Sequence, residues 1–188
     1  MANRTYLYST DLVPTHKNAG QRRSIVGLSE SKYTIPLIYR ALFAGSPSLC
    51  LSNIWHFCTV AHGKSEPLAI INPYLEGLQN LVFFQNNVSH PQARLLLDEA
   101  VEFISQPANE RPYFILELAE YFLMLNDDDE PKGKLPVKVA AFCADHQGDS
   151  QDSLLTIASE LNELPNDLSA VEKVGAILGN CTWSNVLY

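Results

Sequence analysis

The sequence predicts an α+β fold: a single domain over residues 1–188, in which helices outnumber the strands of a small mixed or antiparallel sheet. Two observations carry this prediction. Segments with the helical spacing of apolar residues are more numerous than segments with the alternation of a strand. The predicted strands are also not regularly interleaved with helices, as they would be in a doubly wound parallel sheet. The two Gly-rich phosphate-binding patterns typical of such sheets do not occur in the sequence.

Three short segments predict strands. Thr5 to Ser9 is aromatic and short, which suits an edge or first strand. Leu49 to Ala61 is rich in aromatic and β-branched residues and also predicts a strand. Residues 137–143 alternate between two faces in a pattern that fits a half-buried strand.

Prolines and capping residues predict where the first helices begin. Pro36 stands where a helix can start, and Gly45 can end that helix. Asn72 is expected to cap a second helix whose first turn holds Pro73. Pro91 opens a third helix, in which an apolar stripe faces a core and the charged residues face water.

Two further helices are predicted near the end of the chain. Apolar residues recur at helical spacing over residues 154–161, before Pro165. The second helix is expected to begin with the capping-box pair Ser169 and Glu172, and Gly179 can end it.

The most apolar segment, Arg111 to Leu125, permits two interpretations. It is either one buried helix or a strand from Tyr113 to Leu118 followed by a short helix. Periodicity does not separate the two, because a short apolar run fits both. The polar run over residues 126–133 then predicts a solvated turn.

Composition places the chain among globular proteins. Of the 188 residues, 46% are hydrophobic and 18% are charged, and this low charged fraction leaves apolar surface for a homodimer interface. The four cysteines form no C-x-x-C pair, which favours reduced thiols in the cytoplasm. The sequence has no secretory signal and no run of about eighteen apolar residues, so neither export nor a membrane association is expected.

Charge is divided unequally along the chain. Residues 1–40 hold six Lys/Arg and two Asp/Glu, residues 41–188 hold seven and nineteen, and the net charges of +4 and −12 sum to −8. Such a division bears on recognition rather than on fold. The stretch Pro14–Arg23 is expected to be an exposed basic loop, in which Lys17, Arg22 and Arg23 are candidate partner-binding residues. Because the rest of the chain would repel phosphate, no nucleic acid is expected as a partner.

A possible metal or catalytic site lies in the strand predicted at Leu49 to Ala61. On a strand His56, Cys58 and His62 share one face, where they could bind zinc or pair a Cys nucleophile with a His base. Neighbouring residues on one face are about 7 Å apart, so a bulge or turn would be needed to bring both histidines to one ion. A buried thiol with histidines at the strand ends is the favoured interpretation.

Glu117 and Glu120 are the charges inside the most apolar segment. On a helix their spacing places both carboxylates on one face, where their pKa values can be driven apart into an acid and a base. In the strand interpretation the two side chains point to opposite faces. The favoured alternative is that both face solvent or pair with Arg94 or Arg111.

A polar cluster follows the strand predicted at residues 137–143. Asp145 and His146 are able to bind a metal. Asp149 is better explained as a helix N-cap, with Asp152 three residues later in the first turn. No motif for a cofactor occurs, so none is expected.

Two short stretches resemble a known group of proteins. The opening run Asn3-Arg4-Thr5-Tyr6-Leu7-Tyr8-Ser9, with the later Glu117-Leu118-Ala119-Glu120-Tyr121 and Met124, resembles uncharacterised bacterial cytosolic proteins that open with Asn-Arg-Ser/Thr-Tyr-Leu-Tyr. The resemblance implies a bacterial, soluble setting and carries no activity, fold or site residue.

The sequence therefore favours a non-enzymatic cytoplasmic domain that binds another protein. A small acidic protein of this kind could neutralise a basic toxin domain, in the manner of an immunity protein. The alternative is a small hydrolase or metal-dependent enzyme that uses His56, Cys58 and His62, or the loop from Asp145 to Asp152.

Overall fold

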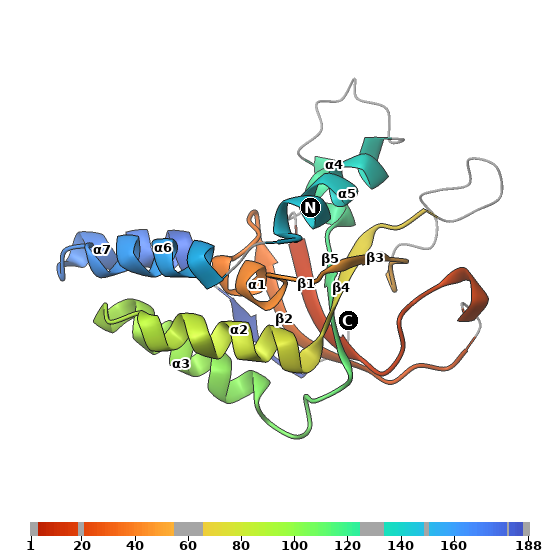
Figure 1. Cartoon of the computed structure of the whole chain (residues 1–188), viewed down its shortest axis with the longest axis horizontal. Coiled ribbons are helices and arrows are strands. Elements are labelled where there is room, and N and C mark those ends of the chain that lie inside the picture. Colours follow the sequence, from red (N-terminus) through yellow and green to blue (C-terminus); the bar gives the residue numbers. More distant parts are fainter. Residues whose placement is uncertain are drawn as a thin grey trace.

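The computed structural model describes residues 4–18, 21–54, 66–124, 134–148, 151–179 and 181–185. Over these residues the chain forms one six-stranded sheet and seven α-helices (Figure 1). The strands are β1 (Arg4–Thr10), β2 (Ile25–Lys32), β3 (Ser48–Cys50), β4 (Ala69–Pro73), β5 (Tyr113–Glu117) and β6 (Thr182–Trp183). The helices are α1 (Leu37–Leu42), α2 (Tyr74–Asn87), α3 (Pro91–Ile104), α4 (Ala119–Met124), α5 (Leu135–His146), α6 (Gln151–Asn162) and α7 (Leu168–Leu178), and a 3-10 turn, η1 (His16–Asn18), lies between β1 and β2.

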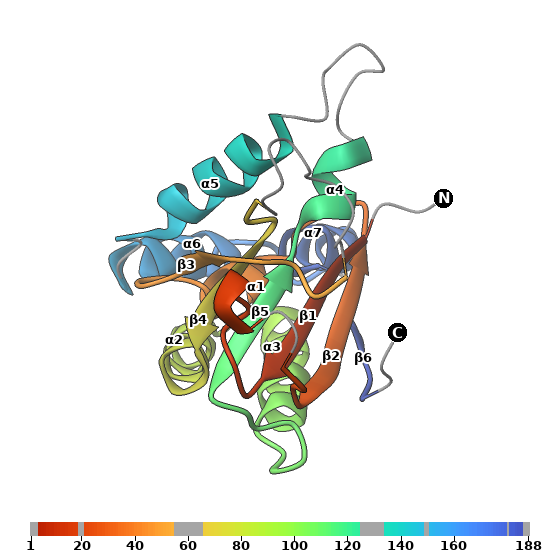
Figure 2. The ribbon, with the colours of Figure 1, turned by 90° about the vertical axis from the view of Figure 1, so that its right-hand side faces the viewer.

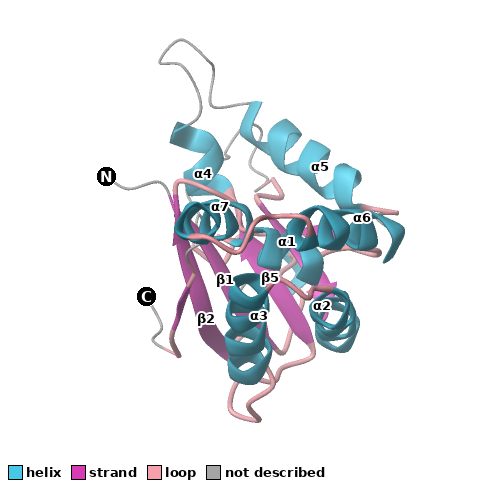
Figure 3. Cartoon of the chain, turned by 90° about the vertical axis from the view of Figure 1, so that its left-hand side faces the viewer, coloured by secondary structure: helices cyan, strands magenta, loops and turns pink. Residues whose placement is uncertain are grey.

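The strand pairings are all antiparallel, and the order across the sheet is β3-β4-β5-β1-β2-β6. The predicted α+β fold with a majority of helix is therefore confirmed, and the sheet is antiparallel rather than mixed. Five helices, α1, α2, α3, α6 and α7, lie in front of the strands in Figure 3 and form a layer on one face of the sheet. The other two, α4 and α5, lie near the end of the sheet where β5 finishes (Figure 2).

The main core lies between the sheet and the layer of five helices. Strand residues Leu7, Leu28, Phe114 and Leu116 are fully buried there. They pack against buried helix residues, among them Tyr39, Leu42, Leu81, Phe84, Leu97, Ile104, Leu161, Val174 and Leu178. Burial of each such side chain stabilises the fold by roughly 1.5–3 kcal/mol.

The opposite face of the sheet carries a smaller apolar cluster. Its buried members are Tyr8, Cys50, Ala69, Ile71 and Ile115. The chain between β1 and β2 covers this face, and η1 stands in front of the strands in Figure 2. The N–H of Leu51 donates to the carbonyl of Pro14 at 3.1 Å, which attaches this β1–β2 connection to the chain after β3.

Strand β1 lies inside the sheet, between β2 and β5. The prediction of a first strand at Thr5 to Ser9 is confirmed, but an edge position is wrong, because β1 pairs with β2 on one side and with β5 on the other. Its pairing with β2 contains a bulge, since Leu7 pairs with Ser29 and Tyr8 with Gly27. The residue left over, Leu28, is buried in the main core.

Helices α1, α2 and α3 begin as the prolines predict, but the expected cap of α2 is wrong. Asn72 lies within β4, is fully buried, and donates from Nδ2 to the carbonyl of Leu42 at 2.9 Å. The helix begins at Tyr74 after Pro73, with no side-chain cap. A buried amide that links β4 to α1 therefore replaces the expected cap.

The strand predicted at residues 137–143 is wrong, because this segment lies in α5. Leu135, Val139, Cys143 and His146 recur at helical spacing and are buried, whereas Val137 is 67% exposed. Alternation in this stretch depends on Ala140 and Ala141, which are small enough to suit either face. Packing against the sheet therefore selected the helical period.

The segment Arg111 to Leu125 is a strand followed by a helix, the second of its two interpretations. Strand β5 pairs with β1 and β4 on its two sides. Its faces are also covered, since Phe114 and Leu116 lie in the main core and Ile115 in the smaller cluster, which explains its continuously apolar sequence. Of the strand predicted at Leu49 to Ala61, only β3 forms; residues 51–54 are not a strand, and residues 55–61 lie outside the described residues.

The two predicted C-terminal helices are present as α6 and α7. The second begins at Leu168, so Ser169 lies inside its first turn and the expected capping box is wrong. Gly179 follows α7 with φ +93°, a left-handed conformation that suits glycine at a helix end. None of the helices in the described residues is both long and apolar enough to cross a membrane.

Candidate functional site

The junction between β5 and α4 holds both carboxylates that the sequence analysis singled out. Glu117 is the last residue of β5, an interior strand, and Glu120 lies in the first turn of α4. The side chain of Glu117 is 1% exposed. The expectation that both carboxylates face solvent or pair with Arg94 or Arg111 is therefore wrong for Glu117.

Burial dominates the electrostatics of Glu117. It raises the pKa of this carboxyl from 4.5 to about 7, against hydrogen bonds from Ser52 and from the amides of Asn53 and Ile54, which lower it. The N–H of Asn53 donates to Glu117 Oε1 at 2.6 Å. The other oxygen, Oε2, is buried and has no hydrogen-bond partner among the described residues. This carboxyl therefore exchanges its proton near neutral pH.

A pKa near the working pH suits a general acid or base. Such a group must also come within hydrogen-bond reach of the atom that it protonates or deprotonates. Glu117 is enclosed by β1, β4 and the chain after β3. The geometry therefore supports a proton-binding group inside the fold rather than an open catalytic centre.

A chain of hydrogen bonds joins Glu117 to the connection between β1 and β2. Asn53 accepts at Oδ1 from Nη1 of Arg23 at 2.6 Å, and Nη2 of Arg23 donates to the carbonyl of Asn18 at 3.3 Å. Arg23 is half-buried, so this candidate partner-binding residue is held inside the structure. Lys17 and Arg22, the other two candidates, are exposed.

Glu120 takes part in a separate contact. Its Oε2 accepts from the hydroxyl of Tyr6 at 3.1 Å, and burial followed by the nearby Glu120 charge raises the pKa of Tyr6 to about 12. Beside this pair, Arg4 Nη1 lies 3.0 Å from Glu30 Oε2 in a salt bridge. The two glutamates thus have different partners, and the helical acid and base pair does not form.

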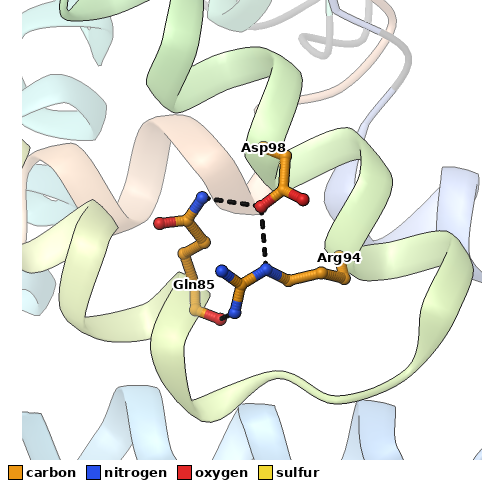
Figure 4. Close-up of polar contacts among 3 residues, drawn as sticks. All are labelled: Gln85, Arg94 and Asp98. Atoms are coloured by element: carbon orange, nitrogen blue, oxygen red, sulfur yellow. Dashed lines mark hydrogen bonds and ion pairs between the residues drawn. The ribbon is translucent and has the colours of Figure 1, made fainter.

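The two arginines expected to neutralise these glutamates are used elsewhere. Figure 4 shows Nε of Arg94 donating to Asp98 Oδ1 at 2.7 Å, with Gln85 Nε2 donating to the same oxygen at 2.7 Å. Arg94 also donates to the carbonyl of Gln85, which joins α2 to α3. Arg111 donates from Nε to the hydroxyl of Ser24 at 2.9 Å.

His146, a predicted metal ligand, is buried at the end of α5. Its Nε2 accepts from Nε of Arg40 at 3.0 Å, and its Nδ1 lies 2.7 Å from the carbonyl of Phe142. Because the arginine Nε can only donate, these contacts assign the proton to Nδ1. Both ring nitrogens are therefore engaged within the protein.

The remaining predicted ligands do not converge in the described structure. Asp145 and Asp152 are both exposed, on α5 and in the first turn of α6 respectively. Within the described ranges, three or more His, Cys, Asp or Glu side chains do not gather in a way that could hold a metal ion. The candidates that lie outside the described residues are Asp149, His56, Cys58 and His62.

Acidic side chains gather on the layer of helices. Residues 91–104 and 151–178, which contain α3, α6 and α7, hold eight acidic and two basic residues. All eight acidic side chains are exposed: Asp98, Glu99, Glu102, Asp152, Glu160, Glu163, Asp167 and Glu172. We call this set the acidic surface. Helices α3, α6 and α7 lie on the opposite face of the sheet from the connection between β1 and β2 (Figure 1).

The residues that support these sites were not predicted from the sequence. Asn53 gave no signal, because its contact with Glu117 joins residues 64 positions apart. Arg40 was the single charge within the apolar run 37–44, a signal that could have drawn attention to it. Its contact with His146 spans 106 positions.

A family model for a domain of unknown function, DUF7822, matches residues 11–173. The chain belongs to this family. In this DUF7822 member the match includes β2 to β5 and α1 to α6, whereas β1 and β6 lie outside it. The match agrees with the expectation of an uncharacterised family. The resemblance to the particular bacterial group is not confirmed, because the opening run Asn3 to Ser9 precedes the matched residues. Neither the curated proteins nor the solved structures contain a match to the chain.

Proposed function

We propose that this domain binds another protein and that its acidic surface contacts a partner rich in lysine and arginine. The observation that carries the proposal is the local charge, eight acidic against two basic residues over 91–104 and 151–178. Asp98 of the acidic surface forms a salt bridge with Arg94, one of the two basic residues in these segments. Charge of one sign over one surface steers an oppositely charged partner and speeds association.

Apolar side chains accompany these charges. Leu95 of α3, Leu155 of α6, and Val171 and Ile177 of α7 are exposed, with Leu95 at 61%. Apolar groups supply most of the contact energy at protein interfaces, while charges at the rim favour the correct partner. This combination supports a protein partner over a small cation.

The basic side of the molecule supports a second contact. Lys17 and Arg22 are exposed on the connection between β1 and β2, on the far face of the sheet from the acidic surface. The two charged regions therefore do not neutralise each other within one molecule. A basic partner, such as a toxin domain neutralised by an immunity protein, would match the acidic surface, and Lys17 and Arg22 would contact a separate acidic group.

Binding through the acidic surface is tested by charge reversal. Glu99→Lys with Glu160→Lys alters the acidic surface, and Glu110→Lys with Asp145→Lys is a matched control at exposed positions outside it. Each protein is used as bait in lysate of the source organism, at low and at high salt, and captured proteins are quantified by mass spectrometry. The proposal expects a protein captured by the wild type and the control, and lost with the first variant and at high salt. Capture that is absent, or equal for both variants, would contradict it.

We also propose a bacterial, cytoplasmic setting and homodimerisation. The cytoplasmic setting draws support from the free thiols of Cys50, Cys143 and Cys181.

A two-fold dimer brings identical patches together, so contact through the acidic surface would oppose like charges. Homodimerisation should therefore use another face. Light scattering that gives the monomer mass at micromolar concentration would contradict the dimer.

The second candidate function is a small hydrolase or metal-dependent enzyme, for which the Glu117 carboxyl is the supporting observation. Its pKa of about 7 suits proton transfer at neutral pH. The metal ligands proposed for this alternative are His56, Cys58 and His62. Elemental analysis of the purified protein and of Cys58→Ala tests it: zinc that is lost in the variant supports the enzyme, and a metal-free wild type contradicts the metal-dependent form.

A further inference from the structure

A pocket of about 390 Å³ lies where α1, α4 and α5 meet the turn after β2. Among the described residues that line it, Arg40 is the charged one. The residues that line it are Thr34, Ile35, Arg40, Tyr121, Phe122 and Phe142. Aromatic rings, two hydroxyl groups and one guanidinium are thus brought together from three separate parts of the chain.

The guanidinium of Arg40 is held in place by the buried side chain of His146. Its Nε donates to Nε2 of His146 at 3.0 Å, and His146 is 1% exposed. The imidazole is fixed in turn by its Nδ1 contact with the carbonyl of Phe142 and by stacking on the ring of Phe142 at 4.2 Å. Binding groups in functional sites are commonly held in position by a hydrogen bond with a buried neighbour, as His146 holds Arg40 here.

Arg40 has no carboxylate partner in the described part of the chain. Its one hydrogen bond there uses Nε, so the two Nη groups have no protein acceptor among the described residues. A guanidinium offers a planar fork of donors that matches a carboxylate or a phosphate. The unused donors of Arg40 therefore suit a group with two anionic oxygens.

The turn beside the pocket is strained. Tyr33, which precedes Thr34, has φ +63° and is 68% exposed. A left-handed backbone is sterically unfavourable for an aromatic residue, and such outliers concentrate at binding and catalytic sites. This turn leads directly into Thr34 and Ile35, which line the pocket.

We propose that this pocket binds a carboxylate or phosphate group attached to a flat apolar ring. The anionic group would contact the Nη atoms of Arg40, and the ring would lie against Phe122 and Phe142. The site uses α1, α4 and α5, whereas the acidic surface uses α3, α6 and α7. This inference therefore goes beyond the proposed protein binding and does not depend on it.

The probes are benzoate and phenyl phosphate, with acetate and inorganic phosphate as anions without a ring. Binding is measured by NMR titration, in which the Arg40 Nε–H signal reports on the site. Phe142→Leu should weaken benzoate or phenyl phosphate more than acetate or phosphate. Arg40→Gln should weaken the aryl anion by about tenfold or more, and Arg40→Lys by less, since lysine keeps the charge but not the fork. Arg22→Gln, which removes an exposed arginine elsewhere, is the matched control and should bind as the wild type does.

The two aryl probes distinguish the anionic group. Binding of benzoate alone assigns a carboxylate ligand, and binding of phenyl phosphate alone assigns a phosphate ligand. If neither benzoate nor phenyl phosphate binds at a concentration of about 10 mM, the proposal is overturned. A dissociation constant above about 10 mM would be too weak for a specific site. Equal binding by Arg40→Gln and the wild type would also overturn it.

Discussion

The buried carboxyl of Glu117 should make the stability of this protein depend on pH in a defined window. Its pKa rises from 4.5 to about 7 on folding, because burial disfavours the charged form. The folded state therefore binds the proton more tightly than the unfolded state does. The resulting stabilisation is fully present below pH 4.5 and is lost as the pH rises to about 7.

The size of the effect follows from the shift. A change of one pKa unit corresponds to about 1.4 kcal/mol, so ionisation of Glu117 should lower the free energy of unfolding by about 3 kcal/mol across this window. Glu117→Gln removes the titration and keeps an oxygen that can accept from the N–H of Asn53. The variant should match the wild type at low pH and exceed its stability by about 3 kcal/mol above pH 7.

The assay is urea denaturation of the wild type, Glu117→Gln and Glu110→Gln at a series of pH values. Glu110 is exposed, and its variant controls for the loss of a negative charge, with an expected change within about 0.5 kcal/mol. The informative quantity is the difference in free energy of unfolding between Glu117→Gln and the wild type. A difference that stays constant between pH 4.5 and 8 would refute the argument that burial governs this carboxyl.

Three further predictions concern packing and polar contacts, and each is measured by urea or thermal denaturation. Gly77→Ala should destabilise the fold by about 1–3 kcal/mol, because the added Cβ would lie 2.9 Å from the ring of Phe114 and still closer to the backbone carbonyl of Leu42. An unchanged free energy of unfolding would contradict this and would show that α2 can shift. Tyr39→Phe should cost about 1 kcal/mol, since it removes a buried hydrogen bond of 2.6 Å to Ser29. Asp98→Asn should change stability by less than about 1 kcal/mol, because its salt bridge is about half exposed; a larger loss would indicate that the contact joining α2 and α3 has a structural role.

The parts of the fold that could be predicted are those that local sequence determines. Pro36 before α1 and Pro91 at the first position of α3 fix the start of each helix, because proline suits the start of a helix and not its interior. Strands β2 and β4 were missed for the opposite reason. Serine, glutamate and glycine in β2 have low strand propensity, and they are ordered by pairing with β1 and by the bulge beside Leu28.

For the candidate site, too, individual residues could be predicted from the sequence but their contacts could not. Glu117 was noticed because a charge in an apolar segment is unusual, but its surroundings depend on Asn53, 64 positions earlier. His146 was noticed as a metal ligand, and its actual partner is Arg40, 106 positions away. The sequence identifies side chains that are able to do chemistry. It does not show which of them come together, because that depends on contacts between distant parts of the chain.

The contacts of Glu117 also connect two features that the sequence presents separately. The N–H of Asn53 donates to the carboxyl, and Oδ1 of the same residue accepts from Arg23, which fixes the connection carrying Lys17 and Arg22. Ionisation of Glu117 strengthens the hydrogen bond from Asn53 while it lowers overall stability. A ligand of Lys17 and Arg22 that moves Arg23 and weakens the contact of Asn53 with Glu117 would change the proton affinity of Glu117. By linkage, protonation of Glu117 would then change the affinity for that ligand by the same coupling free energy. The buried carboxyl is therefore better understood as a reporter of this basic connection than as an isolated catalytic group.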